Sequence, residues 1–185
     1  MPKQDLRQSL LAARQGLSPA QREFAEHTLL LNLVQLLEAQ GLLTKTIALY
    51  IPMRGEVDVT PVSFAIREAG GRACLPRTEN KNAPLVFNLW AADDMLTEKD
   101  VWGIPVATGP AVTPDVVLTP LLGFDRTGHR LGYGAGNYDR TFASSAAKRI
   151  GIGFACQEVS TLPAEAHDIK LHAVVTEREV VMCIL

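Results

Sequence analysis

Short apolar runs alternate with helical segments along most of this chain, and this alternation limits the folds that it can adopt. Two helices come first, one over residues 5–15 and one that starts at Ser18, with Pro19 and Gln21 as its first-turn residues. Gly41 is expected to end the second helix. The pattern then predicts strands at residues 46–51, 72–75, 85–90, 115–122, 149–155, 173–176 and 180–184, with helices at 60–71 and 137–147.

Alternation of this kind predicts an α/β fold, a three-layer sandwich with a largely parallel central sheet. Sheets of this type resemble those of sugar-phosphate isomerases and CoA transferases. The length of 185 residues suits one domain with a substantial core, so we expect a single domain over residues 1–185. Ligands of such sheets gather at the carboxyl ends of the strands, where polar residues become candidate functional groups.

Composition and charge exclude several classes of function. Apolar residues make up 47% of the chain and charged residues 21%, which is typical of a globular protein. The net charge of -2 gives no reason to expect a nucleic acid partner. We also expect no membrane association, because the apolar runs are short and the N-terminus is polar and charged. Three scattered cysteines predict neither a disulfide framework nor a zinc site, so a cytoplasmic location is expected.

Residues 130–140, here called the glycine loop, are the strongest candidate for a ligand-binding segment. Three glycines alternate with larger residues in its sequence, RLGYGAGNYDR: Gly132, Gly134 and Gly136. Such glycines let backbone N–H groups converge on an anion, and the arginines at both ends of the loop would pair with phosphate oxygens. The spacing is neither that of a Walker A motif nor that of the dinucleotide fingerprint, and the alternative is a tight surface turn.

The longer stretch that contains this loop, LTPLLGFDRTGHRLGYGAGNYDR, resembles the signature of the 5-formyltetrahydrofolate cyclo-ligase family. Weaker matches lie in the expected order along the chain. They are Lys3, Arg7 and Arg14, then Tyr50, Pro52 and Glu56-Val57-Asp58, then Leu162-Pro163, His167-Asp168-Ile169 and Val175-Thr176-Glu177. The resemblance therefore covers essentially the whole chain.

The resemblance implies an enzyme that uses ATP and Mg2+ to convert 5-formyltetrahydrofolate to 5,10-methenyltetrahydrofolate, with ADP and phosphate as the other products. Transfer of the γ-phosphoryl group to the formyl oxygen would activate the formyl carbon, and N10 of the folate would then close the ring. The protein would mainly position these groups and stabilise charge. Its partners would be small molecules, and the protein would be a monomer or a weak homo-oligomer.

The resemblance also implies roles for individual residues. The catalytic residues would be Arg130 and Tyr138. The ATP-binding residues would be Lys3, Arg7, Arg130, Leu131, Gly132, Tyr133, Gly134, Ala135, Gly136, Asn137 and Tyr138. The substrate-binding residues would be Ile51, Glu56, Tyr133, Gly134, Ala135, Gly136 and Asn137. The metal ligands would be Asp139 and Asp168.

Chemistry supports several of these assignments. Lys3 and Arg7 stand at i and i+4 of the first expected helix and therefore share a face. The Glu56 carboxylate can accept two parallel N–H bonds, which suits the amide edge of a pterin ring. Asp139 and Asp168 offer the hard oxygen ligands that Mg2+ prefers. The plainer alternatives are a solvated basic face, a loop charge, a helix-start charge and a turn residue.

One residue departs from the family pattern inside the glycine loop. Asn137 stands where an aromatic residue is common, which leaves the substrate preference open. The sequence leaves two other functions open. A sugar-phosphate isomerase-like enzyme would not need a second phosphate-binding element such as Lys3 with Arg7, and a non-catalytic folate or nucleotide binder would not need two metal carboxylates.

Overall fold

The structure is a computed structural model that describes residues 2–165 and 168–184. Its main sheet is built from β1 (Thr46–Ala48), β2 (Arg72–Arg77), β3 (Val86–Leu89), β6 (Ala111–Val112), β7 (Val116–Pro120), β10 (Lys148–Ile152), β11 (Ala173–Val175) and β12 (Val180–Met182). Within the described residues this sheet has eight strands, in the order β12-β11-β10-β7-β1-β2-β3-β6.

Pairing in the main sheet is parallel at the centre and antiparallel at both edges. β1 pairs in parallel with β2 and β7, and β10 pairs in parallel with β7 and β11. β12 joins one edge antiparallel, and β3 and β6 join the other. The central strands β1 and β7 are almost entirely buried, as expected of parallel strands covered on both faces. The predicted α/β fold with a largely parallel central sheet is therefore confirmed.

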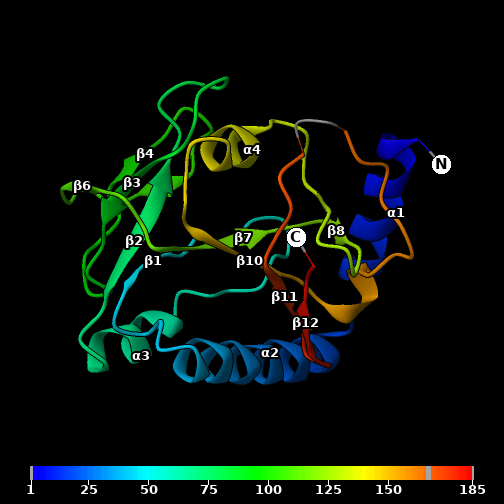
Figure 1. The fold of residues 1–185 in the computed structure, drawn as a ribbon, viewed down its shortest axis with the longest axis horizontal. Helices are drawn as coiled ribbons and strands as arrows, with labels where there is room; N and C mark the ends of the chain where they lie inside the picture. The colour runs from blue at the N-terminus through cyan, green and yellow to red at the C-terminus, as the bar shows by residue number, and fades with distance from the viewer. Residues whose placement is uncertain (1, 166–167, 185) are drawn as a thin grey trace.

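Helices cover both faces of the sheet. They are α1 (Lys3–Gln15), α2 (Pro19–Ala39), α3 (Val62–Glu68) and α4 (Asn137–Phe142), with a 3-10 turn η1 (Ala155–Gln157). Figure 1 shows α2 and α3 on one face of the sheet and α4 on the opposite face, which gives the three predicted layers. It also shows α1 at one end of the molecule, outside these layers, where the helix packs against η1.

Two small antiparallel sheets complete the fold, and one of them lies where the sequence predicts only a loop. They pair β4 (Glu98–Lys99) with β5 (Pro105–Val106), and β8 (Gly123–Phe124) with β9 (Arg130–Leu131). The buried Asp125 carboxylate holds the turn between β8 and β9, since it accepts N–H bonds from Thr127 (3.0 Å) and His129 (3.2 Å). The resulting hairpin fixes the start of the glycine loop.

The helix expected over residues 137–147 is shorter in the structure and ends at Phe142. A local hydrogen bond accounts for the difference, because the Ser145 hydroxyl accepts the Ala147 N–H (3.2 Å) and so offers that backbone an alternative to the helix. The expected strand over residues 46–51 is also shorter and ends at Ala48. The Leu49 N–H still donates to the Cys74 carbonyl oxygen of β2 (2.9 Å), and the chain leaves the sheet after this bond.

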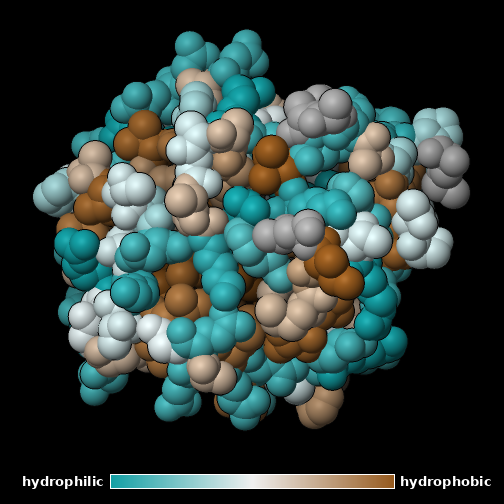
Figure 2. Space-filling model, in the orientation of Figure 1, coloured by the Kyte–Doolittle hydropathy of each residue, from teal (hydrophilic) through white to brown (hydrophobic). Residues whose placement is uncertain are grey.

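The surface is predominantly hydrophilic on the face shown in Figure 2, where hydrophobic residues occur in small groups between polar ones. Among the described residues, no helix combines the length and the apolar character that a membrane crossing requires.

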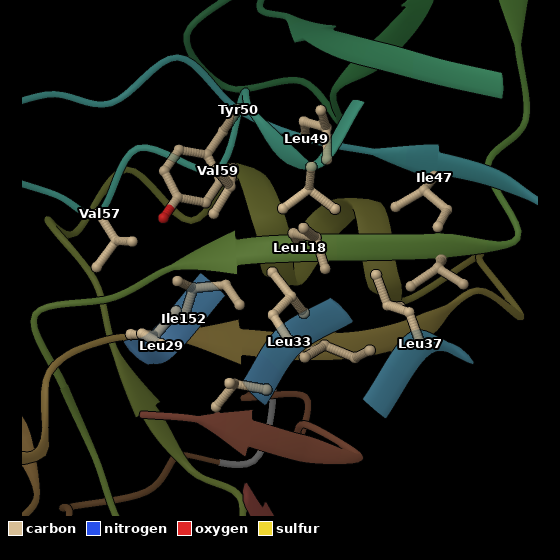
Figure 3. Close-up of a cluster of buried hydrophobic side chains, with 14 of the residues drawn as sticks. Leu29, Leu33, Leu37, Ile47, Leu49, Tyr50, Val57, Val59, Leu118 and Ile152 are labelled. Atoms are coloured by element: carbon tan, nitrogen blue, oxygen red, sulfur yellow. The ribbon is translucent and has the colours of Figure 1, made fainter. Parts of the chain in front are cut away.

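Helix α2 covers one face of the main sheet. Its N-terminus has the predicted capping box, in which the Ser18 hydroxyl accepts the Gln21 N–H (3.3 Å) and the Gln21 side chain accepts the Ser18 N–H (2.9 Å). Leu29, Leu33 and Leu37 follow at four-residue intervals and are fully buried. Figure 3 shows these leucines directed at the central strands, close to Leu118 and Ile152.

Replacing Leu33 by Ala should lower the free energy of unfolding by roughly 2–5 kcal/mol, because the substitution leaves a cavity at the centre of this layer. Urea unfolding followed by circular dichroism measures the loss. Leu31→Ala is the matched control, since Leu31 lies on the same helix with 51% of its surface exposed. The control should cost less than about 1 kcal/mol. Equal losses for both variants would contradict the packing described here.

Candidate active site

The candidate site lies where loops leave the carboxyl ends of the central parallel strands. β1 is followed by the loop that carries Glu56, β7 by the β8–β9 hairpin and the glycine loop, and β10 by η1 and the segment that reaches Asp168. Helix α1 packs against these loops from the end of the molecule. Segments far apart in the sequence therefore meet at one edge of the sheet. In open α/β sheets this edge, at the carboxyl ends of the strands, is where ligands bind.

The basic face of α1 is directed at the glycine loop. The Arg7 Nε donates to the Gly132 carbonyl oxygen at 2.8 Å. A Cβ on Gly134 would lie 3.4 Å from the Arg7 guanidinium, and the φ of +98° at Gly134 is one that L-residues rarely adopt. The predicted proximity of Arg7 to the loop is thus present in the structure.

The end of the glycine loop is shaped by the loop's own arginine. Gly136 has a φ of +69° and lies directly before α4. The Arg140 guanidinium packs against it and donates to the carbonyl oxygen of Ala135. Arg140 therefore supports the backbone of the loop, which is a different role from the phosphate contact that its position at the end of the loop suggests.

Arg130 and Asp139 form a largely buried ion pair across the loop. The Arg130 Nη2 lies 2.6 Å from Asp139 Oδ1, and the Arg130 side chain is only 7% exposed. The same carboxylate oxygen accepts the Ile169 N–H at 3.2 Å, and Arg130 also donates to the Ile169 carbonyl oxygen. The guanidinium lies over the Phe142 ring, 5.0 Å from its centroid. The pair thereby joins the glycine loop to the segment that carries Asp168.

Lys3 reaches the same segment from α1. Its Nζ lies 2.6 Å from Glu165 Oε1 and 3.4 Å from Asp168 Oδ2. The hydrogen bond to Glu165 is the main reason why the Lys3 pKa is raised; burial opposes the rise, and the Asp168 charge adds to it. Asp168 also accepts the Glu165 N–H at 2.8 Å. His167, which precedes Asp168 in the matched motif, lies outside the described residues.

The two aspartates predicted as metal ligands approach the same short segment from different elements. Asp139 bonds to the backbone of Ile169, and Asp168 is the neighbouring residue. No cluster of three or more His, Cys, Asp or Glu side chains suited to a metal occurs in the described part of the chain. A pair of carboxylates nevertheless fits Mg2+, which keeps several waters and takes phosphate oxygens as further ligands.

Glu56 is a buried carboxylate at the end of the loop that follows β1. It is 7% exposed, and its Oε2 accepts the Met53 N–H at 2.9 Å. Burial raises the pKa of Glu56, and the Met53 N–H, the positive charge of Arg14 and the nearby Tyr133 hydroxyl oppose that rise. Ile51, a half-buried neighbour, supplies an apolar side chain next to this loop.

Arg14 is a residue of this site that the sequence prediction left out of the ligand-binding set. Its side chain is 1% exposed and donates to three oxygens: Leu121 O (3.2 Å), Arg54 O (2.9 Å) and Tyr133 Oη (2.7 Å). The spacing of the sequence could have indicated this, because residues 3, 7 and 14 fall on one face of an α-helix. Arg14 was set apart from Lys3 and Arg7 because it lies in the last turn of the helix.

The remaining predicted residues of the loop have distinct surroundings. Tyr133 lies under the Arg54 guanidinium at 5.2 Å, and burial raises the pKa of Tyr138, whose ring packs 5.8 Å from that of Phe142. Asn137 is buried and donates to the Ala83 carbonyl oxygen at 3.1 Å. The amide that replaces a common aromatic residue is thus a tether to a neighbouring loop.

The side chains of Leu131 and Trp102 have surroundings of their own. Leu131 is buried in a small apolar cluster with Leu10 and Leu162, so only its backbone is available to a ligand. Trp102 lies over the Lys81 ammonium group, 4.7 Å from it. A hollow of about 450 Å3 lies beside α4, and its lining contains none of the predicted site residues.

Comparison with known proteins identifies relatives of this arrangement. The model of the 5-formyltetrahydrofolate cyclo-ligase family matches residues 1–177. The 5-formyltetrahydrofolate cyclo-ligase of Mycolicibacterium smegmatis is 33% identical, with 95% of this chain and 94% of that protein covered. The enzyme of the same name from Haemophilus influenzae is 29% identical, with 91% and 94% covered.

Solved structures agree with the sequence comparison. The 5,10-methenyltetrahydrofolate synthetase of Aquifex aeolicus has a TM-score of 0.82 and 29% identity, covering 98% of this chain and 93% of that one. The synthetase of Mycoplasma pneumoniae has a TM-score of 0.79 and 25% identity, covering 96% and 99%. The match spans nearly the entire chain, including every segment that contributes to the candidate site. This chain is therefore a member of the 5-formyltetrahydrofolate cyclo-ligase family, a family of enzymes that form C–N bonds.

Proposed function

We propose that this chain uses ATP and Mg2+ to convert 5-formyltetrahydrofolate to 5,10-methenyltetrahydrofolate through a phosphorylated formyl intermediate. The observation that carries the proposal is the convergence of three basic residues of α1, the glycine loop and the buried Glu56 at one edge of the sheet. A basic region for a triphosphate and a buried carboxylate for a pterin are the two recognition elements that this reaction needs.

The reaction proceeds by two bond exchanges. The formyl oxygen attacks the γ-phosphorus of ATP, and the bond to the β-phosphate oxygen breaks to release ADP. N10 of the folate then attacks the activated formyl carbon, loses its proton, and the carbon–oxygen bond breaks to release phosphate. Both exchanges depend on alignment and on stabilisation of charge more than on proton transfer by the protein.

Lys3, Arg7 and Arg130 are the proposed contacts of the phosphate groups. Arg130 and Lys3 are paired with Asp139 and Asp168 without a ligand, so phosphate would compete for cations that the site already holds in place. The backbone of residues 132–137 would line the path of the nucleotide and the formyl group, with Tyr133 and Tyr138 beside it. Their proximity to Glu56, whose charge acts on both phenol groups, supports this placement.

Glu56 is the proposed recognition group of the pterin, with Ile51 at the apolar side of the ring. Asp139 and Asp168 are the proposed ligands of Mg2+, which would neutralise phosphate charge when bound. We further propose that residues 1–185 form one domain, since the main sheet draws strands from residue 46 to residue 182. The scattered free cysteines favour the cytoplasm, where we propose that the protein acts as a monomer or weak homo-oligomer.

A direct assay tests the proposed reaction. Purified protein is mixed with 5-formyltetrahydrofolate and MgATP, and the near-ultraviolet absorbance of the methenyl product is followed. Product formation that requires both ATP and Mg2+ is the expected result. A folded protein that forms no product would remove the proposed activity, and product without ATP would remove the phosphorylated intermediate.

Glu56→Gln should raise the KM for 5-formyltetrahydrofolate by roughly tenfold or more, because a neutral amide cannot accept two N–H bonds from a pterin edge as a carboxylate does. The KM for ATP should change little. Steady-state kinetics with each substrate varied in turn measures both constants. Glu68→Gln on α3, an exposed position, is the control, and an unchanged folate KM in the Glu56 variant would exclude the assigned contact.

Asp139→Asn should reduce kcat/KM by about tenfold or more without unfolding the protein. The amide oxygen can still accept from Arg130 and from the Ile169 N–H, so the variant removes charge and keeps the local bonds. Titration with Mg2+ separates a metal role from a structural one: the concentration of Mg2+ needed for half-maximal rate should rise. The same dependence on Mg2+ as in the unaltered protein would place Asp139 outside the metal site.

A further inference from the structure

Arg14 has an unusual position for a charged side chain. It is among the largest fully buried side chains of the described residues, and its hydrogen bonds join α1 to three other segments: the loop after β1, the segment after β7 and the glycine loop. A guanidinium in such a place is costly unless its hydrogen bonds and its charge are compensated. The Leu121 and Arg54 carbonyl oxygens satisfy donors but carry no net charge.

The negative charge that compensates Arg14 is the Glu56 carboxylate, which acts on Arg14's partner Tyr133 as well. Arg14 has donors only, so the Tyr133 hydroxyl oxygen accepts from it at 2.7 Å. The Glu56 carboxylate lies near the Tyr133 hydroxyl, because each group acts on the pKa of the other. Arg14 also donates to the Arg54 carbonyl oxygen, two residues before Glu56, so one guanidinium joins the Glu56 loop to the glycine loop.

Tyr133 is also part of the glycine loop. It stands between Gly132, whose carbonyl oxygen accepts from Arg7, and Gly134, whose backbone lies against the Arg7 guanidinium. The position of its hydroxyl is consequently linked to the backbone that is proposed to meet ATP. The Arg54 guanidinium over its ring restricts the side chain further.

We propose that Arg14 is a positioning residue, which holds the Glu56 loop at the Arg54 carbonyl oxygen and the glycine loop at the Tyr133 hydroxyl, and so keeps Glu56 aimed at the reduced pterin. The inference rests on the proposed function, because it assigns the folate contact to Glu56. Arg14 itself is not a contact of either substrate. Its effect is transmitted by its bonds to the Arg54 carbonyl oxygen and the Tyr133 hydroxyl, and these links make folate recognition depend on the conformation of the glycine loop.

The charges around Glu56 set the expected direction of a pH effect. Arg14 on α1 and Arg54 in the same loop are positive, and the phenol groups of Tyr133, Tyr50 and Tyr138 complete the titratable neighbourhood. Burial raises the pKa of Glu56, whereas the Arg14 charge and the nearby Tyr133 hydroxyl lower it. Removal of either group should therefore raise this pKa, and folate binding should be lost at a higher pH as the solution is acidified.

Arg14→Lys and Tyr133→Phe test the proposal. Lysine keeps the charge but cannot make the three directed bonds, and phenylalanine removes only the hydroxyl that accepts from Arg14. Each variant should raise the KM for 5-formyltetrahydrofolate, by roughly tenfold for Arg14→Lys and roughly fivefold for Tyr133→Phe, with a smaller change in kcat. The acidic limb of the kcat/KM profile for folate should move to higher pH in Tyr133→Phe and stay near its place in Arg14→Lys, which keeps the positive charge that acts on Glu56.

The double variant and a control separate this role from general loss of structure. Because the two groups share one hydrogen bond, the double variant should raise the folate KM by less than the product of the single effects. Arg67→Lys, which alters an exposed arginine of α3, should leave the KM and the pH limb unchanged. Multiplicative effects, or an acidic limb that does not move in Tyr133→Phe, would overturn the proposal.

Binding without turnover distinguishes this proposal from the function on which it rests. Titration of each protein with 5-formyltetrahydrofolate in the absence of ATP, followed by tryptophan fluorescence or calorimetry, reports on folate binding separately from turnover. If the unaltered protein turns over and Arg14→Lys binds folate with unchanged affinity, the role of Arg14 is refuted and the proposed function stands. An unaltered protein that neither binds folate nor turns over would refute the proposed function instead.

Discussion

Parallel pairing of β1, β7 and β10 is the constraint on which the rest of the structure depends. Parallel strands end at the same edge of a sheet, so the segments that leave them emerge together. Here those segments carry Glu56, the glycine loop and Asp168. The leucines of α2 stabilise this arrangement, because they are fully buried against one face of the paired strands.

The sequence was sufficient for the parts of the fold that follow local rules. The Ser18 capping box and the apolar runs that contain β1 and β7 each act within a few residues, and each element was predicted, although β1 is shorter than expected. The end of α4 was not, because the Ser145 hydroxyl competes with the helix through a bond that propensity alone does not reveal. The β8–β9 hairpin was missed for a similar reason, since its turn depends on a buried carboxylate that also bonds to Leu162.

The candidate site was predictable in its location and less so in its internal contacts. Resemblance to a family marked Glu56 and the glycine loop, and the structure brings the surrounding loops together at one edge of the sheet. The roles of those residues remain predictions. Arg14 and Asn137 show what sequence alone leaves out, because the value of each depends on a partner distant in sequence: the Tyr133 hydroxyl for one and the Ala83 carbonyl for the other.

The bonds of α1 have a consequence for how the site comes into being. Arg14 meets Leu121 across 107 residues of chain, Arg7 meets Gly132 across 125, and Lys3 meets Glu165 across 162. Closing such long loops is entropically unfavourable and slow compared with local pairing. During synthesis, α1 can form these bonds only after residues 121, 132 and 165 have been added to the chain. A growing polypeptide can assemble its sheet strand by strand, yet it gains a complete set of ligand-binding charges only in the final stage of folding.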